Sequence, residues 1–140
     1  MKQGDEFDLA FANFARRAWS GSYEPNTDVY LDDAGERIVV HVELAGIDAE
    51  NLRVGVDERH LVIVGSRTQG REARNGSILQ KEIQYGEFVK KIRLPVPISY
   101  EDATALYRDG ILTIELPVSA TDHFPTSRTE IRMIVRRTLA

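Results

Sequence analysis

The sequence predicts an all-β fold, an antiparallel β-sandwich. Residues 27–117 contain short runs in which apolar and polar residues alternate, with turn signals between them, and this is the pattern of half-buried strands joined by hairpins. No long helical period separates these runs, so the parallel sheet of a strand-helix-strand fold is not expected. The strongest hairpin signal is Asp109-Gly110 within Ala103–Pro117, because glycine tolerates the positive φ of a tight turn.

Composition is that of one ordinary globular domain with tails. The chain has 140 residues, of which 42% are hydrophobic and 29% charged, and a domain of about 90–100 residues can bury a real core. No apolar run approaches the roughly 20 residues that span a bilayer, so we expect no membrane insertion. The acidic start of the chain lacks the apolar core of a secretory signal, and we expect a cytoplasmic protein.

Charge and cysteine content exclude several classes of site. There is no cysteine, hence no disulfide, thiolate nucleophile or sulfur-ligated metal. A net charge of −4 gives nucleic acid no general electrostatic reason to bind. The expected partners are therefore proteins.

The first segment, Asp5–Trp19, has the apolar period of an amphipathic helix. Its apolar positions are Phe7, Phe11, Phe14, Ala15, Ala18 and Trp19. Two interpretations stay open: an arm that contacts partner subunits and unfolded proteins, or a helix packed permanently on its own domain. The linker 21–26 contains Gly21 and Pro25 and breaks the helix.

The first strands of the sandwich follow this linker. Strands are expected over Thr27–Asp32 and Arg37–Leu44, with a turn at Asp33-Ala34-Gly35 between them. Asp48 can cap a single helical turn over residues 48–51.

Four further strands are expected before the proline pair at residues 95 and 97. They cover Leu52–Asp57, His60–Arg67, Ile78–Ile83 and Glu87–Leu94. Leu52, Val54 and Val56 lie on one face of the first of these. The polar stretch Thr68–Ser77 is expected to be a loop.

The chain changes character beyond Pro117. Ser119–Thr129 has little to bury and is expected to be a flexible connector. An isolated apolar patch follows, in which an extended backbone places Ile131, Met133 and Val135 on one side. The predicted organisation is an N-terminal arm at 1–24, a sandwich at 25–117 and a C-terminal extension at 118–140.

No catalytic constellation is visible in the sequence. His41, His60 and His123 are far apart and have no metal-ligand spacing. The acidic pairs fall at turns, where carboxylates bond the local backbone, and no glycine-rich loop could cradle a phosphate. We therefore expect no enzyme activity, no cofactor and no metal.

Two paired landmarks resemble the α-crystallin domain of small heat shock proteins, the Hsp20 family. The first is Ala105 followed by Asp109-Gly110-Ile111-Leu112 and closed by Leu116-Pro117; Ala105, Gly110 and Leu112 are its signature residues. The second runs from Glu82 through Tyr85-Gly86 and Phe88 to Leu94-Pro95. The resemblance covers about residues 25–117.

This resemblance implies an immunoglobulin-like sandwich with a short helical N-terminal arm and a flexible C-terminal extension. It further implies an ATP-independent chaperone that binds partly unfolded client proteins and assembles into dimer-based oligomers. The client-binding arm would carry Phe7, Phe11, Phe14 and Trp19.

The resemblance also implies an exchange of strands between two subunits. Residues 78–83 of one subunit would pair with the Thr27–Asp32 strand of the other, which satisfies two exposed edges at once. The residues involved are Ile78, Leu79, Gln80, Lys81, Glu82 and Ile83 with Asp28, Val29, Tyr30 and Leu31. Ile83 replaces an arginine common in the family, and an ordinary hairpin within one chain is the alternative.

The C-terminal patch is similar to the family's I-x-I/V anchor, which docks on a neighbouring subunit. The anchor residues would be Ile131, Met133 and Val135, and the receiving groove would be lined by Leu52, Val54, Val56, Ala103 and Ala105. Methionine departs from the family pattern, so the anchor pair is either Ile131 with Met133 or Met133 with Val135. A tail that simply continues as a strand is the alternative.

Two other functional classes compete with the chaperone interpretation. One is a p23-like co-chaperone or adaptor with the same sandwich, which would lack the exchanged strand and the C-terminal anchor. The other is a small enzyme or a carbohydrate-binding sandwich, for which the strands carry neither catalytic groups nor an aromatic platform.

Overall fold

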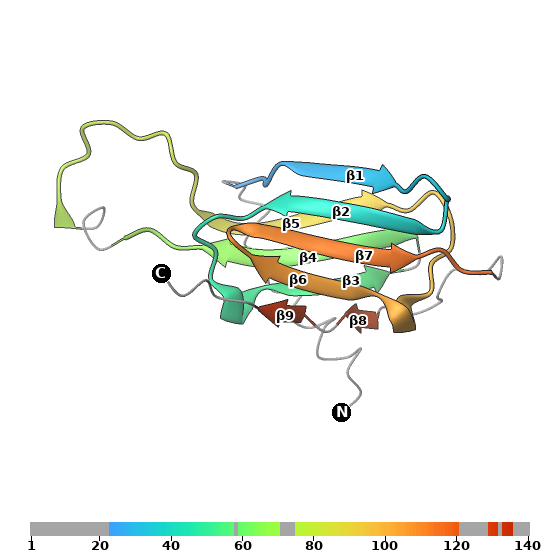
Figure 1. The fold of residues 1–140 in the computed structure, drawn as a ribbon. Coiled ribbons are helices and arrows are strands. Elements are labelled where there is room, and N and C mark those ends of the chain that lie inside the picture. Colours follow the sequence, from blue (N-terminus) through green and yellow to red (C-terminus); the bar gives the residue numbers. More distant parts are fainter. Residues whose placement is uncertain (1–22, 58, 71–74, 121–128, 132, 136–140) are drawn as a thin grey trace, which may run out of the picture.

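The computed structural model of the chain confirms the predicted sandwich. It describes residues 23–57, 59–70, 75–120, 129–131 and 133–135, so the predicted helix Asp5–Trp19 lies outside the described residues. Two sheets are packed face to face (Figure 1), one with five strands in the order β1-β2-β7-β6-β9 and one with four in the order β5-β4-β3-β8. Their pairings are antiparallel except that of β6 with β9.

The first five strands agree with the predicted runs to within one or two residues, apart from residues 78–83, and the next two form the hairpin expected at Asp109-Gly110. The last two lie in the C-terminal segment, where a continuing strand was the alternative. The strands are β1 Thr27–Leu31, β2 Arg37–Glu43, β3 Arg53–Asp57, β4 His60–Arg67, β5 Gly86–Arg93, β6 Thr104–Arg108, β7 Ile111–Pro117, β8 Thr129–Ile131 and β9 Met133–Val135. Two single-turn 3-10 helices, η1 Ala49–Asn51 and η2 Tyr100–Asp102, complete the described elements.

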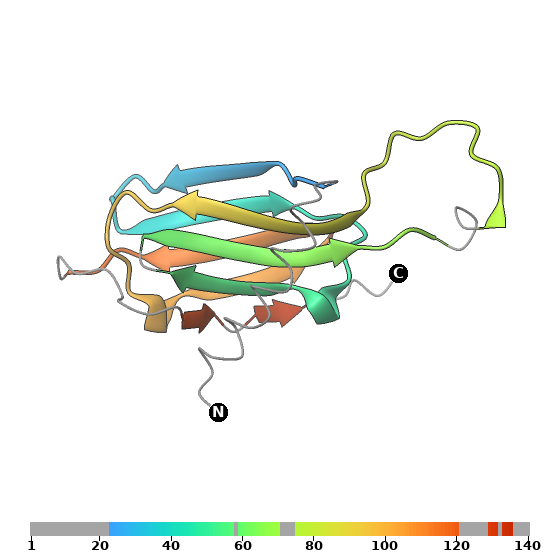
Figure 2. The ribbon, with the colours of Figure 1, turned by 180° about the vertical axis from the view of Figure 1, so that it is seen from behind.

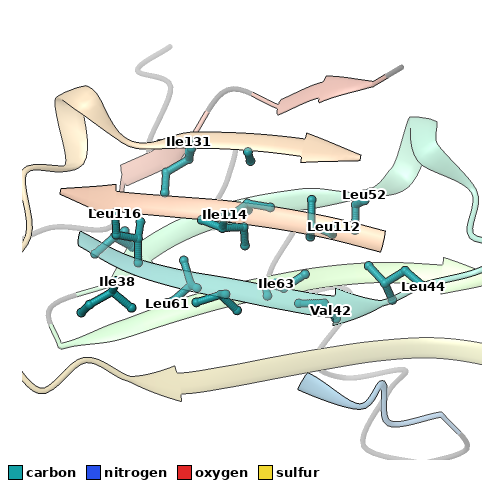
Figure 3. Packing of buried hydrophobic residues seen from close by; sticks show 14 of the residues in the cluster. Ile38, Val42, Leu44, Leu52, Leu61, Ile63, Leu112, Ile114, Leu116 and Ile131 are labelled. Carbon is teal, nitrogen blue, oxygen red and sulfur yellow. The ribbon is translucent and has the colours of Figure 1, made fainter. Parts of the chain in front are cut away.

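The core forms where the inner faces of the two sheets meet (Figure 3). Alternate residues of β2 and β7 face alternate residues of β3 and β4, as the period of two requires. Fully buried members include Val40, Ile63, Phe88 and Ile114. Gly65 on β4 lies opposite Phe88 on β5, and an added Cβ there would come within 2.9 Å of the Phe88 ring. The glycine therefore makes room for the aromatic ring.

Two predicted turns have the expected backbone geometry. Asp109 and Gly110, between β6 and β7, both have positive φ, of 53° and 80°, as a tight hairpin requires. Asp48 caps η1, since its Oδ1 accepts a hydrogen bond from the backbone N–H of Glu50 at 3.2 Å.

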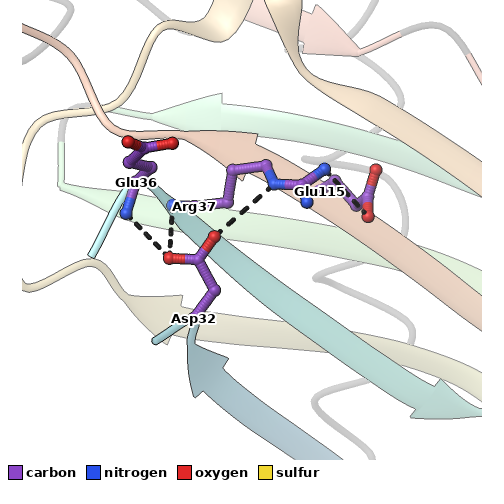
Figure 4. A network of polar contacts seen from close by, with 4 residues as sticks. All are labelled: Asp32, Glu36, Arg37 and Glu115. Carbon is purple, nitrogen blue, oxygen red and sulfur yellow. Dashed lines mark hydrogen bonds and ion pairs between the residues drawn. The ribbon is translucent and has the colours of Figure 1, made fainter. Parts of the chain in front are cut away.

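The β1–β2 turn is organised by the Asp32 carboxylate (Figure 4). Its Oδ1 accepts hydrogen bonds from the backbone N–H groups of Glu36 at 2.7 Å and Arg37 at 3.2 Å. The Arg37 guanidinium lies 3.6 Å from Oδ2 and 3.5 Å from the Glu115 carboxylate on β7. The backbone bond from Glu36 is the main reason that the pKa of Asp32 is lowered, against a smaller opposing effect of desolvation.

Candidate functional site

The outer edge of the five-stranded sheet is formed by β1. This strand pairs with β2 on one side, with Val29 opposite Val40. Val29, Tyr30 and Leu31 are all exposed, and Leu31 keeps 59% of its surface accessible. An open strand edge with exposed apolar side chains is a template for pairing with another strand.

The segment between β4 and β5 projects well beyond the end of the sandwich (Figures 1 and 2). Its described residues 78–83 contain no strand in the single chain, so the alternative of a hairpin within one chain is wrong, and the strand exchanged with a second subunit stays a prediction. The physical reason is that a strand needs a hydrogen-bonded neighbour, and the projection carries these residues away from both sheets. Ile78, Leu79 and Ile83 are exposed, Leu79 to 97%.

Arg67, at the end of β4, holds the base of this projecting segment. Its Nε and Nη2 donate hydrogen bonds to the carbonyl oxygen of Gln84 at 2.9 and 2.6 Å, and its Nη1 donates to that of Ala45 at 3.1 Å. Its guanidinium carbon also lies 4.1 Å from the ring centroid of Tyr23. One side chain thereby joins the start of the described chain, the end of β2 and the start of β5.

Sequence reasoning missed Arg67, because an arginine at a strand end has no distinguishing pattern. Tyr23, on which it stacks, also contacts the Phe88 ring edge-on, with centroids 5.4 Å apart. Burial raises the pKa of Tyr23, and the charge of Arg67 opposes that rise. Together these contacts fix the root of the projecting segment on the sandwich.

The predicted anchor and groove residues meet at the other edge of the sandwich. The strand β8 adds to β3 with Ile131 opposite Val54, and β9 adds to β6 with Met133 opposite Ala105. Ile131 keeps 4% of its surface exposed and belongs to the core cluster. The remaining groove residues Leu52 and Val56 are buried and Ala103 is partly buried.

These contacts are made within one chain. The C-terminal residues bridge the two sheets where β3 and β6 would otherwise present open edges (Figure 1). The Arg53 guanidinium lies 3.1 Å from the Glu130 carboxylate across this junction. Docking on a neighbouring subunit was expected, and the same groove is filled here by the chain's own segment.

The signature residues Ala105, Gly110 and Leu112 have structural roles. Ala105 and Leu112 are buried in the core. Gly110 combines φ of 80° with a close approach to Ala45, whose Cα would lie 3.3 Å from an added Cβ. The Gly110 carbonyl oxygen accepts a hydrogen bond from the N–H of Leu44 at 2.8 Å, which ties the hairpin to the end of β2.

The two histidines in the described part of the chain, His41 and His60, are not brought together. His41 lies on β2, in the five-stranded sheet, and packs edge-on against Tyr30 with ring centroids 5.5 Å apart. His60 lies on β4 in the other sheet, and His123 lies outside the described residues. Within the described part of the chain, no group of three or more His, Asp or Glu residues could hold a metal ion. None of the helices described there is long and apolar enough to cross a membrane.

Comparison with known proteins decides the family. The sequence model of the Hsp20/alpha crystallin family matches residues 31–133, which include the strands from β2 to β8. This chain is a member of the Hsp20/alpha crystallin family. Small heat shock protein C4 of Rickettsia felis is 32% identical over 119 residues, covering 79% of this chain and 72% of that protein. The 16.9 kDa class I heat shock protein 1 of Triticum aestivum is 30% identical over 118 residues, covering 81% and 78%.

Solved structures of small heat shock proteins have the same fold. The protein from Xylella fastidiosa superimposes with a TM-score of 0.63 at 26% identity, over 72% of this chain and 91% of that one. Heat shock protein 16.0 of Schizosaccharomyces pombe gives a TM-score of 0.59 at 28% identity, over 71% and 93%. The sandwich of this Hsp20 protein is thus the family's domain.

Proposed function

We propose that this protein is an ATP-independent holdase, which binds partly unfolded proteins and keeps them from aggregating, and that its working form is a dimer-based oligomer. Membership of the small heat shock protein family supports a chaperone role. The observation that carries the proposal is the pair of open apolar elements in one chain, the β1 edge and residues 78–83. A monomer with both left unpaired would present two templates for aggregation.

Exchange of residues 78–83 between two subunits would cover both elements. The exposed apolar residues Ile78, Leu79 and Ile83 would lie on β1 of the partner, next to its Val29 and Leu31. The closed contact is isologous, because each subunit gives one segment and receives one. Arg67 supports this proposal by fixing the root from which the segment projects.

The C-terminal segment supports a second, reversible contact. The groove contacts that Ile131 makes in one chain are the contacts that a neighbour's segment would make, so exchange loses none of them. Burying one isoleucine is worth about 1.5–3 kcal/mol, whereas ordering each tail residue costs roughly 1–2 kcal/mol. Such a balanced contact opens readily, and multivalency holds the oligomer together. The backbone register sets Ile131 opposite Val54 and Met133 opposite Ala105, and this supports our proposal that these two residues are the anchor pair.

The small heat-shock protein from Xylella fastidiosa has a distinct high order structure, and we propose a similar assembly principle for this chain. On mild heating, subunits would separate and present the groove and the N-terminal arm with Phe7, Phe11, Phe14 and Trp19 to clients. The oligomer would thus keep these apolar surfaces buried until heating separates the subunits and non-native proteins bind them.

Light scattering of a heat-labile client protein tests the holdase activity. The client is heated with and without this protein, without nucleotide, across a range of subunit ratios. The proposal predicts suppression at near-stoichiometric ratios. Absence of suppression by well-folded protein would contradict it and favour an adaptor with one dedicated partner, as in p23-like proteins.

A further inference from the structure

The outer faces of the two sheets differ in burial. On the five-stranded sheet, outward residues of the central strands, such as Val39 on β2 and Thr113 on β7, are half-buried. On the four-stranded sheet, the outward residues Val62 and Val64 of β4 have 0% of their surface exposed. Val39 and Val62 are the same residue type in equivalent central positions. Side-chain size therefore does not explain the difference.

The two valines are separate from the sandwich core. They alternate along β4 with Leu61 and Ile63, which point inward, and they form a cluster of their own. Among the described residues, the apolar side chain packed on them is Val89 of β5, which pairs with Val64. On the other side Val62 pairs with Gly55 of β3, which has no side chain.

Paired residues on adjacent strands lie beside one another on the sheet and not above one another. Val89 and Gly55 thus flank the valines without covering them, yet no valine surface is accessible. Gly55 and Ser66, which share this outer face, are also buried. This face is named here the β4 outer face and is defined by Gly55, Val62, Val64, Ser66 and Val89.

We propose that residues 1–22 of the same chain dock on the β4 outer face through their aromatic side chains. The residues that follow this segment lie at the β5 edge of the sandwich: Tyr23 packs on the inward-facing Phe88 of β5 with ring centroids 5.4 Å apart, and the Glu24 carboxylate lies 3.4 Å from Nζ of Lys90. The strand β5 is the edge of the four-stranded sheet and lies beside β4. Figure 2 shows the first described residues at this edge.

The length and the aromatic content of residues 1–22 suit them to cover the β4 outer face. Adjacent strands are about 4.8 Å apart, so roughly 10 Å separate β5 from β3, whereas a 15-residue helix is about 22 Å long. The segment carries Phe7, Phe11, Phe14 and Trp19, and Gly55, which pairs with Val62, adds no side chain of its own to compete with an aromatic ring. The connector 121–128 carries a single aromatic residue, Phe124, and leads into β8 at the opposite edge of the sheet.

Docking would hide the aromatic residues of the arm in the resting protein. Release would then expose two apolar surfaces together, the arm and the β4 outer face. This inference goes beyond holdase activity, and its tests need no client, so either proposal can fail alone.

Trp19 is the only tryptophan of the chain and reports the docking directly. In the full-length protein we expect blue-shifted emission and protection from acrylamide quenching. The double variant V62T/V64T keeps the β-branched shape but weakens the apolar contact, so the emission should shift to the red and the protection should be lost. The matched control V39T, on the outer face of the other sheet, should leave both unchanged. Equal effects of the two variants, or no effect of V62T/V64T in a folded protein, would overturn the proposal.

A second measurement decides the matter if V62T/V64T does not fold. The chain has no cysteine, so K91C places a single bimane label on β5, opposite Val62 in register. Trp19 should quench this label at contact range, and W19F should restore its brightness. The control T104C, on the outer face of β6, should not respond to W19F. A label on K91C that is equally bright with and without Trp19 would overturn the proposal.

Mixing separates docking within the chain from docking on a neighbour. Labelled K91C protein that also carries W19F is mixed with unlabelled wild type and allowed to exchange subunits. The proposal predicts no quenching in the mixed oligomers. Quenching there would show that a neighbour's arm occupies the face and would overturn the same-chain assignment.

Discussion

Ile131 of β8 lies in register opposite Val54 of β3, and this isoleucine keeps only 4% of its surface exposed. A residue of the C-terminal segment is thereby part of the sandwich core. The three-residue strand β8 has few ladder hydrogen bonds of its own. The side chain of Ile131 therefore determines whether the segment stays in the groove.

The first prediction concerns Ile131→Ala. Truncation of a buried isoleucine costs about 2–5 kcal/mol, which exceeds the stabilisation that the hydrogen bonds of a three-residue strand supply. The C-terminal segment should therefore leave the groove while the sandwich stays folded. Native mass spectrometry should then show smaller assemblies, while the circular dichroism of the sheets persists. Ile111→Ala is the matched control, because Ile111 on β7 is 38% exposed; its effect on mass should be negligible. Unchanged assembly in Ile131→Ala would contradict the anchor assignment.

The second prediction concerns Gly65→Ala. The new Cβ would lie 2.9 Å from the Phe88 ring and 3.2 Å from a methyl group of Leu52. Both neighbours are buried, so the free energy of unfolding should fall by about 1–3 kcal/mol, measured by urea denaturation. Phe88→Leu should reduce the penalty, so that the double variant is more stable than the sum of the two single changes predicts. Simple additivity would show that the ring and the glycine are not coupled.

The third prediction concerns pH. Since the pKa of Asp32 is lowered in the folded protein, chiefly by the backbone hydrogen bond from Glu36, its carboxylate stabilises the fold above its unfolded pKa. That contribution is lost as the pH falls through the lowered folded pKa. Thermal unfolding should therefore show wild type more stable than Asp32→Asn at neutral pH, with the gap closing in acid. Asp33→Asn controls for the change in net charge, and a gap that persists in strong acid would contradict the assignment.

The fourth prediction concerns Arg67→Lys. Lysine keeps the charge but loses the planar fork that reaches both Gln84 and Ala45. Opening at the base of the projecting segment should become easier by about 1.5–3 kcal/mol per lost charged hydrogen bond, seen as faster amide exchange around Gly86. Arg93→Lys, at the exposed far end of β5, should leave that exchange unchanged. Equal exchange in the two variants would mean that Arg67 does not hold the segment.

Local pattern predicted most of the fold. The hairpin at Asp109-Gly110 and the cap at Asp48 were predictable because a few adjacent residues determine them. The buried face of β3 follows from its alternation in the same way. A strand at 78–83 does not form within one chain, because a strand requires a partner and sequence alternation does not say where that partner lies.

Contacts between distant segments were not predictable in detail. The family resemblance predicted that Ile131, Val54 and Ala105 belong to one site. It predicted neither the strand register nor that one chain contributes both sides of the site. The role of Arg67 depends on three segments meeting at one point, which no spacing reveals. The burial of Val62 and Val64 was equally hidden, because the alternation of β4 is apolar on both faces.

The proposed dimer depends on the pairing of residues 78–83 with β1 of a second subunit. Amide hydrogen exchange of the full chain, followed at high concentration and again after dilution to the monomer, tests it most directly. We expect protected amides in residues 78–83 and along β1 in the oligomer, with both sets losing protection together on dilution. Amides of residues 78–83 that exchange at the unprotected rate in the intact oligomer would contradict it.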